Sequence, residues 1–297
     1  MSKTAAVEWA ADRTAIDRAL DALCTAHEHS LSPQVADAVK YSLHGGKRLR
    51  GLLLLAAYRT AGGDADASDL AAAIEVVHAY SLVHDDLPCM DDDDMRRGRP
   101  TVHRVFGVKV AAAAGVAMVP LAVAAASSAC GVLGLPSETC GQAVVELMRA
   151  SGASGMIGGQ LLDLEGEGRP LGLAELEQIH RGKTGALIRS AVVLGGIAAQ
   201  AGATEVAALG TFGESIGLAF QIADDVLDIT ATTDRLGKPA GRDLDLRKST
   251  YPAIMGIDAA TERATQLVAD GCAALRGAGL LSTELDVLAR FVVERES

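Results

Sequence analysis

The sequence predicts an all-α protein, and three observations support this fold class. Apolar residues make up 49% of the chain and aromatic residues only 3%, and Ala and Leu, which are strong helix formers, occur in almost every segment. Apolar side chains recur at helical spacing nearly throughout, and no stretch alternates with period two over a length that suggests a sheet. The 297 residues contain no linker or low-complexity tract. The simplest architecture is therefore a single helical domain over residues 1–297.

The expected helices follow this periodicity, and glycine and proline separate them. Breaks are expected at residues 62–63, at Pro136, at residues 166–170, at Gly202 and at residues 277–279. The helices are expected over residues 8–29, 33–41, 51–61, 68–84, 108–133, 137–151, 173–201, 205–230, 251–277 and 282–296.

Charge and cysteine content exclude some functions. A net charge of −11 argues against a nucleic-acid partner, which requires a basic surface. The N-terminus has no positive stub followed by an apolar core, so no signal peptide is expected. The cysteines form no CxxC pair, which favours a reducing compartment and a cytoplasmic location. They are Cys24, Cys89, Cys130, Cys140 and Cys272.

One uncharged segment has the length of a membrane span. It runs from Val110 to Leu135 and is rich in Ala and Gly, with Pro120 inside. Because it lacks the density of large apolar residues typical of a lipid-facing helix, a helix buried on all sides of a bundle is favoured, and no membrane span is expected.

The first candidate site is acidic. Residues 85–94 contain six aspartates, which repel one another unless cations neutralise them. Mg²⁺ prefers such hard oxygen ligands, usually one or two carboxylates together with water and substrate phosphates. In a regular helix Asp85 and Asp91 lie about 600° apart, on different faces. Pro88 interrupts the helix, and a bulge there would bring Asp91 back beside Asp85.

Basic residues follow this cluster directly. Arg96 and Arg97 come after the last aspartate, so carboxylates for a metal and guanidinium groups for phosphate lie side by side in the sequence. His78 lies seven residues before Asp85, which is two turns away on the same helix face. The segment therefore predicts a diphosphate site.

A second acidic cluster needs no break in its helix. Asp224 and Asp228 are an i, i+4 pair and share one face about 6 Å apart, and Gln221 lies one turn earlier. Gly45 and Gly46 precede a basic run at the start of a helix, where backbone N–H groups favour an anion. Further single cations beside glycines are Lys183 and Lys238.

Taken in order, these segments resemble the trans-prenyl diphosphate synthases, most of all the bacterial farnesyl and geranylgeranyl diphosphate synthases. The similar segments are the GGKRLR run at residues 45–50, DDLPCMD at 85–91, GQLLDL at 159–164, KTGAL at 183–187, FQIADDVLD at 220–228, GKPAGRD at 237–243 and KSTYP at 248–252. The resemblance covers residues 40–255. It implies an all-α bundle around a deep cavity, and usually a homodimer.

The resemblance also implies the role of each candidate residue. Asp85, Asp91, Asp224 and Asp228 would hold Mg²⁺, three ions in all, on an allylic diphosphate, with Asp86 and Asp225 in support. The same diphosphate would contact Arg96, Lys183 and Lys238, and isopentenyl diphosphate would contact Lys47, Arg50, His78 and Arg97. Thr184 and Gln221 would offer oxygens near an allylic cation. The product length would depend on the residues just before the first acidic motif, here Tyr80 and Ser81.

An aromatic residue at Tyr80, with the two-residue insertion in the first motif, resembles the farnesyl type; the geranylgeranyl type is the alternative. The sequence departs from the family at Val108 and Val116, where the family commonly has acidic residues. Both positions are expected at or near a dimer interface.

Three other functions are less well supported. A terpene cyclase normally carries an Asn/Ser/Glu metal triad in place of the second cluster and does not need the Gly-Gly-Lys-Arg run. A metal-dependent phosphohydrolase would have His among its ligands. A non-catalytic prenyl synthase subunit tends to lose one Asp cluster, and both are intact here.

Overall fold

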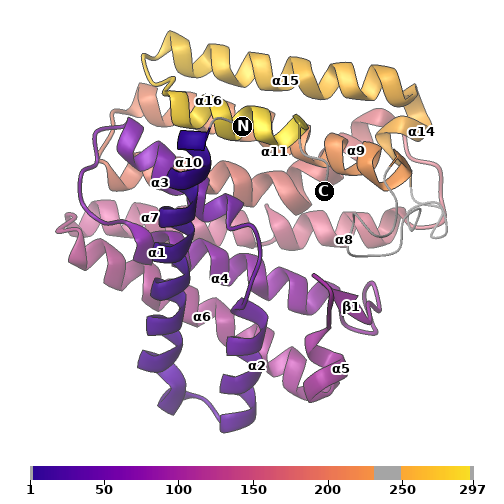
Figure 1. Cartoon of the computed structure of the whole chain (residues 1–297). Helices are drawn as coiled ribbons and strands as arrows, with labels where there is room; N and C mark the ends of the chain where they lie inside the picture. Colours follow the sequence, from indigo (N-terminus) through magenta and orange to yellow (C-terminus); the bar gives the residue numbers. More distant parts are fainter. Residues whose placement is uncertain (1–2, 231–248, 295–297) are drawn as a thin grey trace. The chain divides into compact units, whose positions relative to one another are not determined.

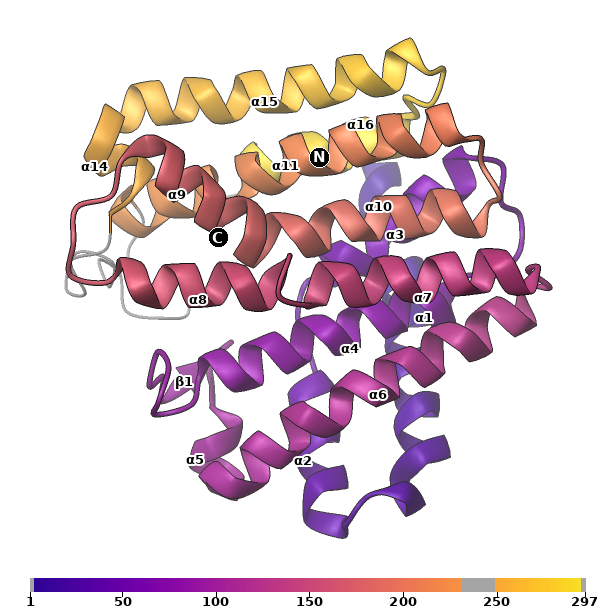
Figure 2. The ribbon, with the colours of Figure 1, turned by 180° about the vertical axis from the view of Figure 1, so that it is seen from behind.

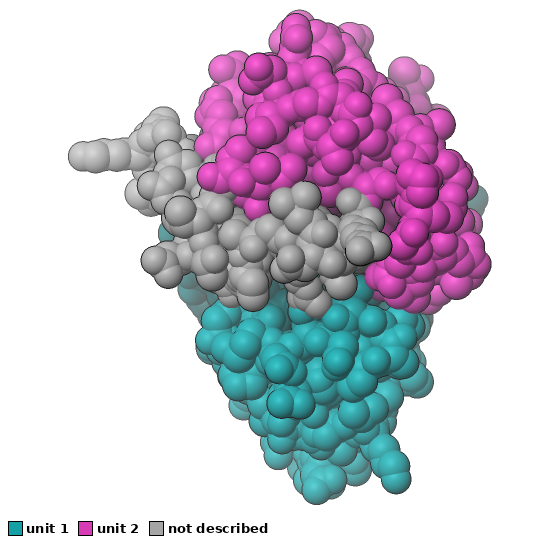
Figure 3. Space-filling view, turned by 90° about the vertical axis from the view of Figure 1, so that its right-hand side faces the viewer, with its two compact units in different colours: residues 1–55, 64–145 teal, residues 56–63, 146–297 magenta. Residues whose placement is uncertain are grey.

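The computed structural model describes residues 3–230 and 249–294, with side chains described from Trp9 onward (Figure 1). Within these ranges the backbone is helical apart from loops and one two-stranded hairpin, so the predicted all-α class is confirmed. The chain forms two compact units, Met1–Leu55 with Asp64–Val145 and Ala56–Gly63 with Glu146–Ser297, coloured separately in Figure 3.

Unit 1 is built around a pair of closely packed helices. Helix α4 (Ser68–Asp85) lies along α6 (Val108–Val132), and Figures 1 and 2 show this pair from opposite sides. Helix α1 (Lys3–His27) packs on α4, and α2 (Pro33–Leu43) packs on α6. Fully buried Ile16, Leu70, Ile74 and Met118 form part of the core. The remaining elements are η1 (Glu28–Ser30), the start of α3 (Leu49–Thr60), β1 (Met95–Arg96), β2 (Arg99–Pro100), α5 (Val102–Phe106) and the start of α7 (Ser137–Ser151).

Unit 2 has a long central helix, α11 (Ala203–Thr230). Helices α10 (Ala186–Ala198), α15 (Ile257–Gly277) and α16 (Thr283–Glu294) pack against it, and Figure 2 shows α15 running alongside α11. Phe212, Leu187, Ile188 and Leu194 are fully buried in this core. The other elements are α8 (Met156–Gly166), α9 (Leu173–His180), the π-helical turn η2 (Arg181–Gly185) and α14 (Tyr251–Met255).

The structure differs from the expected helices in several places, and the short helix α5 was also not expected. Helix α8 was not expected, because Gly158 and Gly159 lower the helix propensity of its first turns. The helix expected over 173–201 is α9 and α10 joined by the π-helical turn. The helix expected over 251–277 breaks at Gly256, whose φ of +86° lies outside the helical region. The β1–β2 hairpin pairs two residues with two, which is too short to give a periodic signal.

Two helices, α6 and α11, are long and apolar enough to cross a bilayer by length and composition. In their most apolar windows 44% and 56% of the residues are buried. Core helices of water-soluble proteins pass the same test, so this is weak evidence for a span. The expectation that residues 110–135 are buried on all sides is wrong for this chain, since Val116 and Val132 on α6 are 64% and 73% exposed.

Candidate active site

The first acidic motif begins where α4 ends. Asp86 caps the helix, and its N–H donates to the Leu82 carbonyl. The chain then turns back, because the Asp91 N–H donates to the Asp85 carbonyl over 2.9 Å. Asp91 thus returns beside Asp85, as the unequal spacing predicted. The cause differs from the prediction: the helix stops before Pro88 instead of continuing through a bulge.

Asp86 is turned toward a basic residue of the hairpin. Arg96 in β1 donates two hydrogen bonds to Asp86 Oδ1, at 2.8 and 2.5 Å, and a third to Asp93 over 3.0 Å. Burial raises the pKa of Asp86, and the Arg96 charge opposes this shift. The hairpin therefore holds Arg96 against the acidic motif, where it can compensate carboxylate or phosphate charge.

The loop with the Gly-Gly-Lys-Arg run has several residues in the left-handed region of backbone conformation. Gly45, Gly46 and Arg48 all have positive φ, at 77°, 101° and 56°. Arg48 is a structural anchor, because its buried guanidinium donates to the Leu43 carbonyl over 2.6 Å and to Asp17 over 2.7 Å. These bonds fix the loop that leads into α3.

The same loop meets the hairpin around His78. Arg97 donates to the Gly45 carbonyl over 3.2 Å and to His78 Nε2 over 3.4 Å. A Cβ on Gly46 would lie 2.7 Å from the Arg97 guanidinium and would displace it, and the φ of +101° also favours glycine here. Burial lowers the pKa of His78 well below its usual value, and Arg50 and Arg97 lower it further. Three elements thus bring His78, Arg50 and Arg97 into one cationic cluster suited to an anion.

The two predicted chain-length residues lie on α4 one turn before the acidic motif. Tyr80 is only 9% exposed, and its ring meets the His84 ring edge-on with centroids 4.8 Å apart. Ser81 donates to the His78 carbonyl over 2.8 Å. Burial raises the pKa of Tyr80, and the nearby Asp85 charge adds to this shift.

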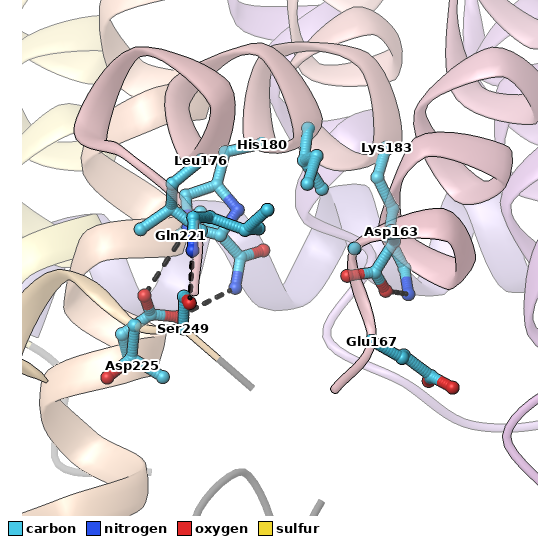
Figure 4. A pocket seen from close by; sticks show the side chains of 12 residues that line it. Asp163, Glu167, Leu176, His180, Lys183, Gln221, Asp225 and Ser249 are labelled. Carbon is cyan, nitrogen blue, oxygen red and sulfur yellow. Dashed lines mark hydrogen bonds and ion pairs between the residues drawn. The ribbon is translucent and has the colours of Figure 1, made fainter. Parts of the chain in front are cut away.

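In unit 2 the π-helical turn carries Lys183 and Thr184. Lys183 Nζ forms an ion pair with Asp163 on α8 at 2.6 Å, which Figure 4 shows. Thr184 donates its hydroxyl proton to Gln221 on α11 over 2.9 Å. The structure therefore brings Thr184 and Gln221 together, as expected for two oxygen-bearing side chains that act at one place.

Asp225 anchors the Gln221 side chain. Gln221 donates its amide N–H to Asp225 Oδ1 over 3.2 Å (Figure 4). Asp225 Oδ2 accepts from His180 Nε2 over 3.3 Å and from the Tyr251 backbone N–H over 3.0 Å. Asp225 is 3% exposed and Asp228 4%, while Asp224 is half-buried.

Several of these residues line a pocket of about 110 Å³ in unit 2 (Figure 4). Its polar lining includes Asp163, His180, Lys183, Gln221 and Asp225. Sequence reasoning had not assigned a role to His180 or Tyr251. A signal for His180 exists, since it lies one helical turn before Lys183. Lys238, the remaining predicted diphosphate contact, lies outside the described residues.

The acidic residues suit a magnesium ion bound together with substrate. Within the described ranges no three His, Cys, Asp or Glu side chains group closely enough to hold a metal by themselves. Mg²⁺ does not require such a cage, because it usually takes one or two carboxylates and completes its shell with water and phosphate. The turn at Asp85 and Asp91, and the pair Asp224 and Asp228 on one helix face, supply donors of this kind.

Comparison with known proteins identifies the family. A profile described as polyprenyl synthetase matches residues 32–273. The chain is 45% identical over 267 residues to farnesyl diphosphate synthase of Escherichia coli K12, covering 88% of this chain and 89% of that protein. It is 43% identical over 257 residues to geranylgeranyl pyrophosphate synthase 12, chloroplastic, of Arabidopsis thaliana, covering 84% and 71%.

Solved structures of similar enzymes support the same family assignment. Geranylgeranyl pyrophosphate synthetase of Pyrococcus horikoshii Ot3 superposes with a TM-score of 0.87 at 31% identity, covering 99% of both chains. A geranyltransferase of Helicobacter pylori, solved in complex with magnesium and isoprenyl diphosphate, gives a TM-score of 0.84 at 29% identity, again covering 99% of both chains.

An all-α fold with two Asp-rich segments and separate cationic groups defines a prenyltransferase that works on diphosphates. The chain belongs to the polyprenyl synthetase family. It is a trans-prenyltransferase of the short-chain farnesyl and geranylgeranyl diphosphate synthase type.

Proposed function

We propose that this enzyme is a magnesium-dependent farnesyl diphosphate synthase that works as a single domain. The choice of farnesyl diphosphate as product rests on the position of Tyr80. This residue is buried one turn before the first acidic motif, and its ring packs against the His84 ring. Tyr80 lies five residues before Asp85, roughly 7.5 Å along the helix, and would form the floor of the prenyl cavity together with Ser81. A smaller floor residue would allow the geranylgeranyl product, which is the alternative.

The two substrates use different groups of side chains. Isopentenyl diphosphate binds the cationic cluster at His78, Arg50 and Arg97, together with Lys47. The allylic diphosphate binds beside the acidic motifs, where Arg96, Lys183 and Lys238 contact it. Arg96 and Arg97 are consecutive, but Arg96 bonds the acidic motif at Asp86 and Arg97 bonds the Gly45 carbonyl and His78. This divergence supports two diphosphate subsites rather than one.

Mg²⁺ bound by Asp85, Asp91, Asp224 and Asp228 would neutralise the allylic diphosphate and favour its departure; we propose three ions. The ion pair between Lys183 and Asp163 positions the Lys183 ammonium group for the same charge.

The chain's own side chains then protect the allylic cation. Thr184 donates to Gln221, and Gln221 donates to Asp225, so this chain of hydrogen bonds orients the two side chains. Their oxygens would lie near the place where positive charge develops. The double bond of isopentenyl diphosphate attacks the cation to form the new carbon–carbon bond, and the resulting cation loses a proton to the departing pyrophosphate. The reaction requires an apolar environment that excludes water, which would otherwise trap the cation, and the chain's high content of Ala and Leu suits this.

We further propose a homodimer formed through α6. The exposed residues on this helix include Val108, Val116 and Val132, and no residue from Val110 to Leu135 is charged. A helix of 25 residues is about 38 Å long, enough for a continuous contact with a second copy. Apart from Lys109 at its start, the exposed face of α6 is uncharged, and an exposed face of this kind is unusual on a monomer, which supports the dimer.

A cytoplasmic location is also proposed. All five cysteines are free thiols in the structure, and those at Cys130 and Cys272 are buried. Free thiols fit a reducing compartment.

The test of the proposed function is an elongation assay with purified enzyme. Isopentenyl diphosphate is supplied with dimethylallyl, geranyl or farnesyl diphosphate as primer, with Mg²⁺ or with excess chelator. We expect farnesyl diphosphate as the main product from the first two primers and no product without Mg²⁺. Geranylgeranyl diphosphate as the main product would overturn the choice of chain length, and elongation in chelator would overturn the magnesium mechanism.

A further inference from the structure

The His84 side chain connects α4 to α6 next to the proposed cavity floor. Its ring lies edge-on to Tyr80, at an interplanar angle of 66°. Its Nε2 lies 3.2 Å from the Ala112 carbonyl on α6, within hydrogen-bond distance. His84 and Tyr80 are four residues apart on α4, so their side chains are neighbours on one face. The position of the Tyr80 ring therefore depends on a residue fixed to another helix.

His84 can reach α6 only because residue 115 is glycine. A Cβ on Gly115 would lie 2.1 Å from His84 Nε2 and 2.3 Å from Cδ2, far inside van der Waals contact. Gly115 lies inside α6, where alanine would be favoured by about 1 kcal/mol of helix propensity. The helical backbone at residue 115 does not require glycine. The His84 ring requires it, because the ring occupies the space that a Cβ would take.

We propose that Gly115 and His84 are specificity-determining residues that set the product length by fixing Tyr80. This inference rests on the proposed role of Tyr80 as the cavity floor. Gly115 admits the His84 ring against α6, His84 supports the Tyr80 ring, and Tyr80 stops the growing chain. Neither residue touches the diphosphate groups in this account, so both act on chain length and not on the chemical step.

Substitutions at Gly115 and His84 are expected to change the product length in opposite directions. Gly115→Ala forces the His84 ring away from α6 and toward Tyr80, which makes the cavity shallower. His84→Ala removes the support, so Tyr80 can move aside and the cavity becomes deeper. In the double variant the added methyl group of residue 115 no longer meets an imidazole, so the clash disappears.

The experiment measures product distribution by chromatography after incubation with isopentenyl and geranyl diphosphates. The control is Gly131→Ala on the same helix, where a Cβ meets nothing within 4 Å. We expect a shift from farnesyl toward geranylgeranyl product with His84→Ala. With Gly115→Ala, assayed from dimethylallyl diphosphate, we expect a shift toward geranyl product. The double variant should give longer products than Gly115→Ala alone, and the control should match the unchanged enzyme.

The Tyr80→Ala variant tests the role of Tyr80 as the cavity floor separately from its support by His84. If Tyr80→Ala lengthens the product while His84→Ala leaves it unchanged, Tyr80 is the cavity floor but His84 does not support it, and the inference is overturned. If Tyr80→Ala leaves the product unchanged, the floor itself is wrong and the inference fails with it. Should Gly115→Ala prove insoluble, the His84→Ala and double variants still decide the matter, since neither contains the clash.

Discussion

At the scale of single residues, His78 shows how a neutral group can serve an anion site. Burial and the charges of Arg50 and Arg97 hold its pKa well below the usual value, so the ring is neutral near pH 7. It receives a hydrogen bond from Arg97 at one nitrogen, which leaves the proton on the other. His78 thus offers a hydrogen-bond donor without adding a further charge to the cluster.

This neutral state predicts which substitution is tolerated. Gln also offers an uncharged N–H, so His78→Gln should keep the KM for isopentenyl diphosphate within a few-fold. His78→Ala should raise this KM about tenfold, because a hydrogen bond to a charged group is lost. Steady-state kinetics with varied isopentenyl diphosphate checks both. Equal KM values for the two variants would contradict the role of the ring as a donor.

Asp225 illustrates a residue whose motif suggests one role and whose contacts indicate another. The Asp-rich pattern gives Asp225 a supporting role beside the metal ligands, but its oxygens accept hydrogen bonds from Gln221, His180 and the Tyr251 backbone. The pattern could not reveal this, since His180 and Tyr251 come from other elements of the fold.

We expect His180→Ala to affect catalysis more than binding. Loss of a buried hydrogen bond of about 1–3 kcal/mol would loosen Asp225 and Gln221, so kcat should fall roughly 10- to 100-fold while the KM values change little. His180→Asn, which keeps a donor, should recover part of kcat. A loss confined to KM or to thermal stability, with kcat intact, would show that His180 has no positioning role.

At the scale of elements, the π-helical turn η2 approaches α8 very closely. A Cβ on Gly159 would lie 2.0 Å from the backbone nitrogen of Lys183, and one on Gly182 would lie 2.9 Å from Gly159 Cα. Backbone atoms cannot move aside as flexible side chains can. The two glycines therefore let α8 fix the turn that presents Lys183 and Thr184.

Gly159→Ala should displace this turn. We expect a lower melting temperature and a loss of activity, because the added methyl group overlaps backbone atoms. The matched control is Gly141→Ala on α7, where a Cβ meets nothing within 4 Å and which should be neutral or slightly stabilising. Differential scanning fluorimetry and elongation assays measure both effects. A Gly159→Ala enzyme as stable and active as the control would contradict the close packing.

The elements that the sequence predicted well are those with strong apolar periodicity, such as α4, α6 and α11. The missed elements follow from physical causes: α8 is rich in glycine, and the π-helical turn keeps a helical pattern while changing its hydrogen bonds. The return of Asp91 to Asp85 was predicted from the spacing, but the end of α4 before Pro88 was not. The bracing of Tyr80 by His84 was not predictable, because it depends on where α6 crosses α4.

At the scale of the whole molecule, the proposed dimer depends on the exposed stripe of α6. Val116→Arg places a charge in its middle, where the uncharged helix would meet a second copy. We expect this variant to be mainly monomeric at micromolar concentration in sedimentation velocity. The control Ile257→Arg, at another exposed apolar position, on α15, should leave the association state unchanged. A dimeric Val116→Arg enzyme would place the interface elsewhere.

The central claim is that both Asp-rich motifs serve one magnesium-dependent reaction. The most direct measurement is the elongation rate of Asp85→Asn, Asp224→Asn and the double variant at saturating Mg²⁺ and substrates. If the motifs act as a unit, each single variant loses on the order of a thousandfold in kcat, and the double variant loses little more than the worse single one. A single variant that keeps its rate within about tenfold, or losses that multiply in the double variant, would contradict the claim.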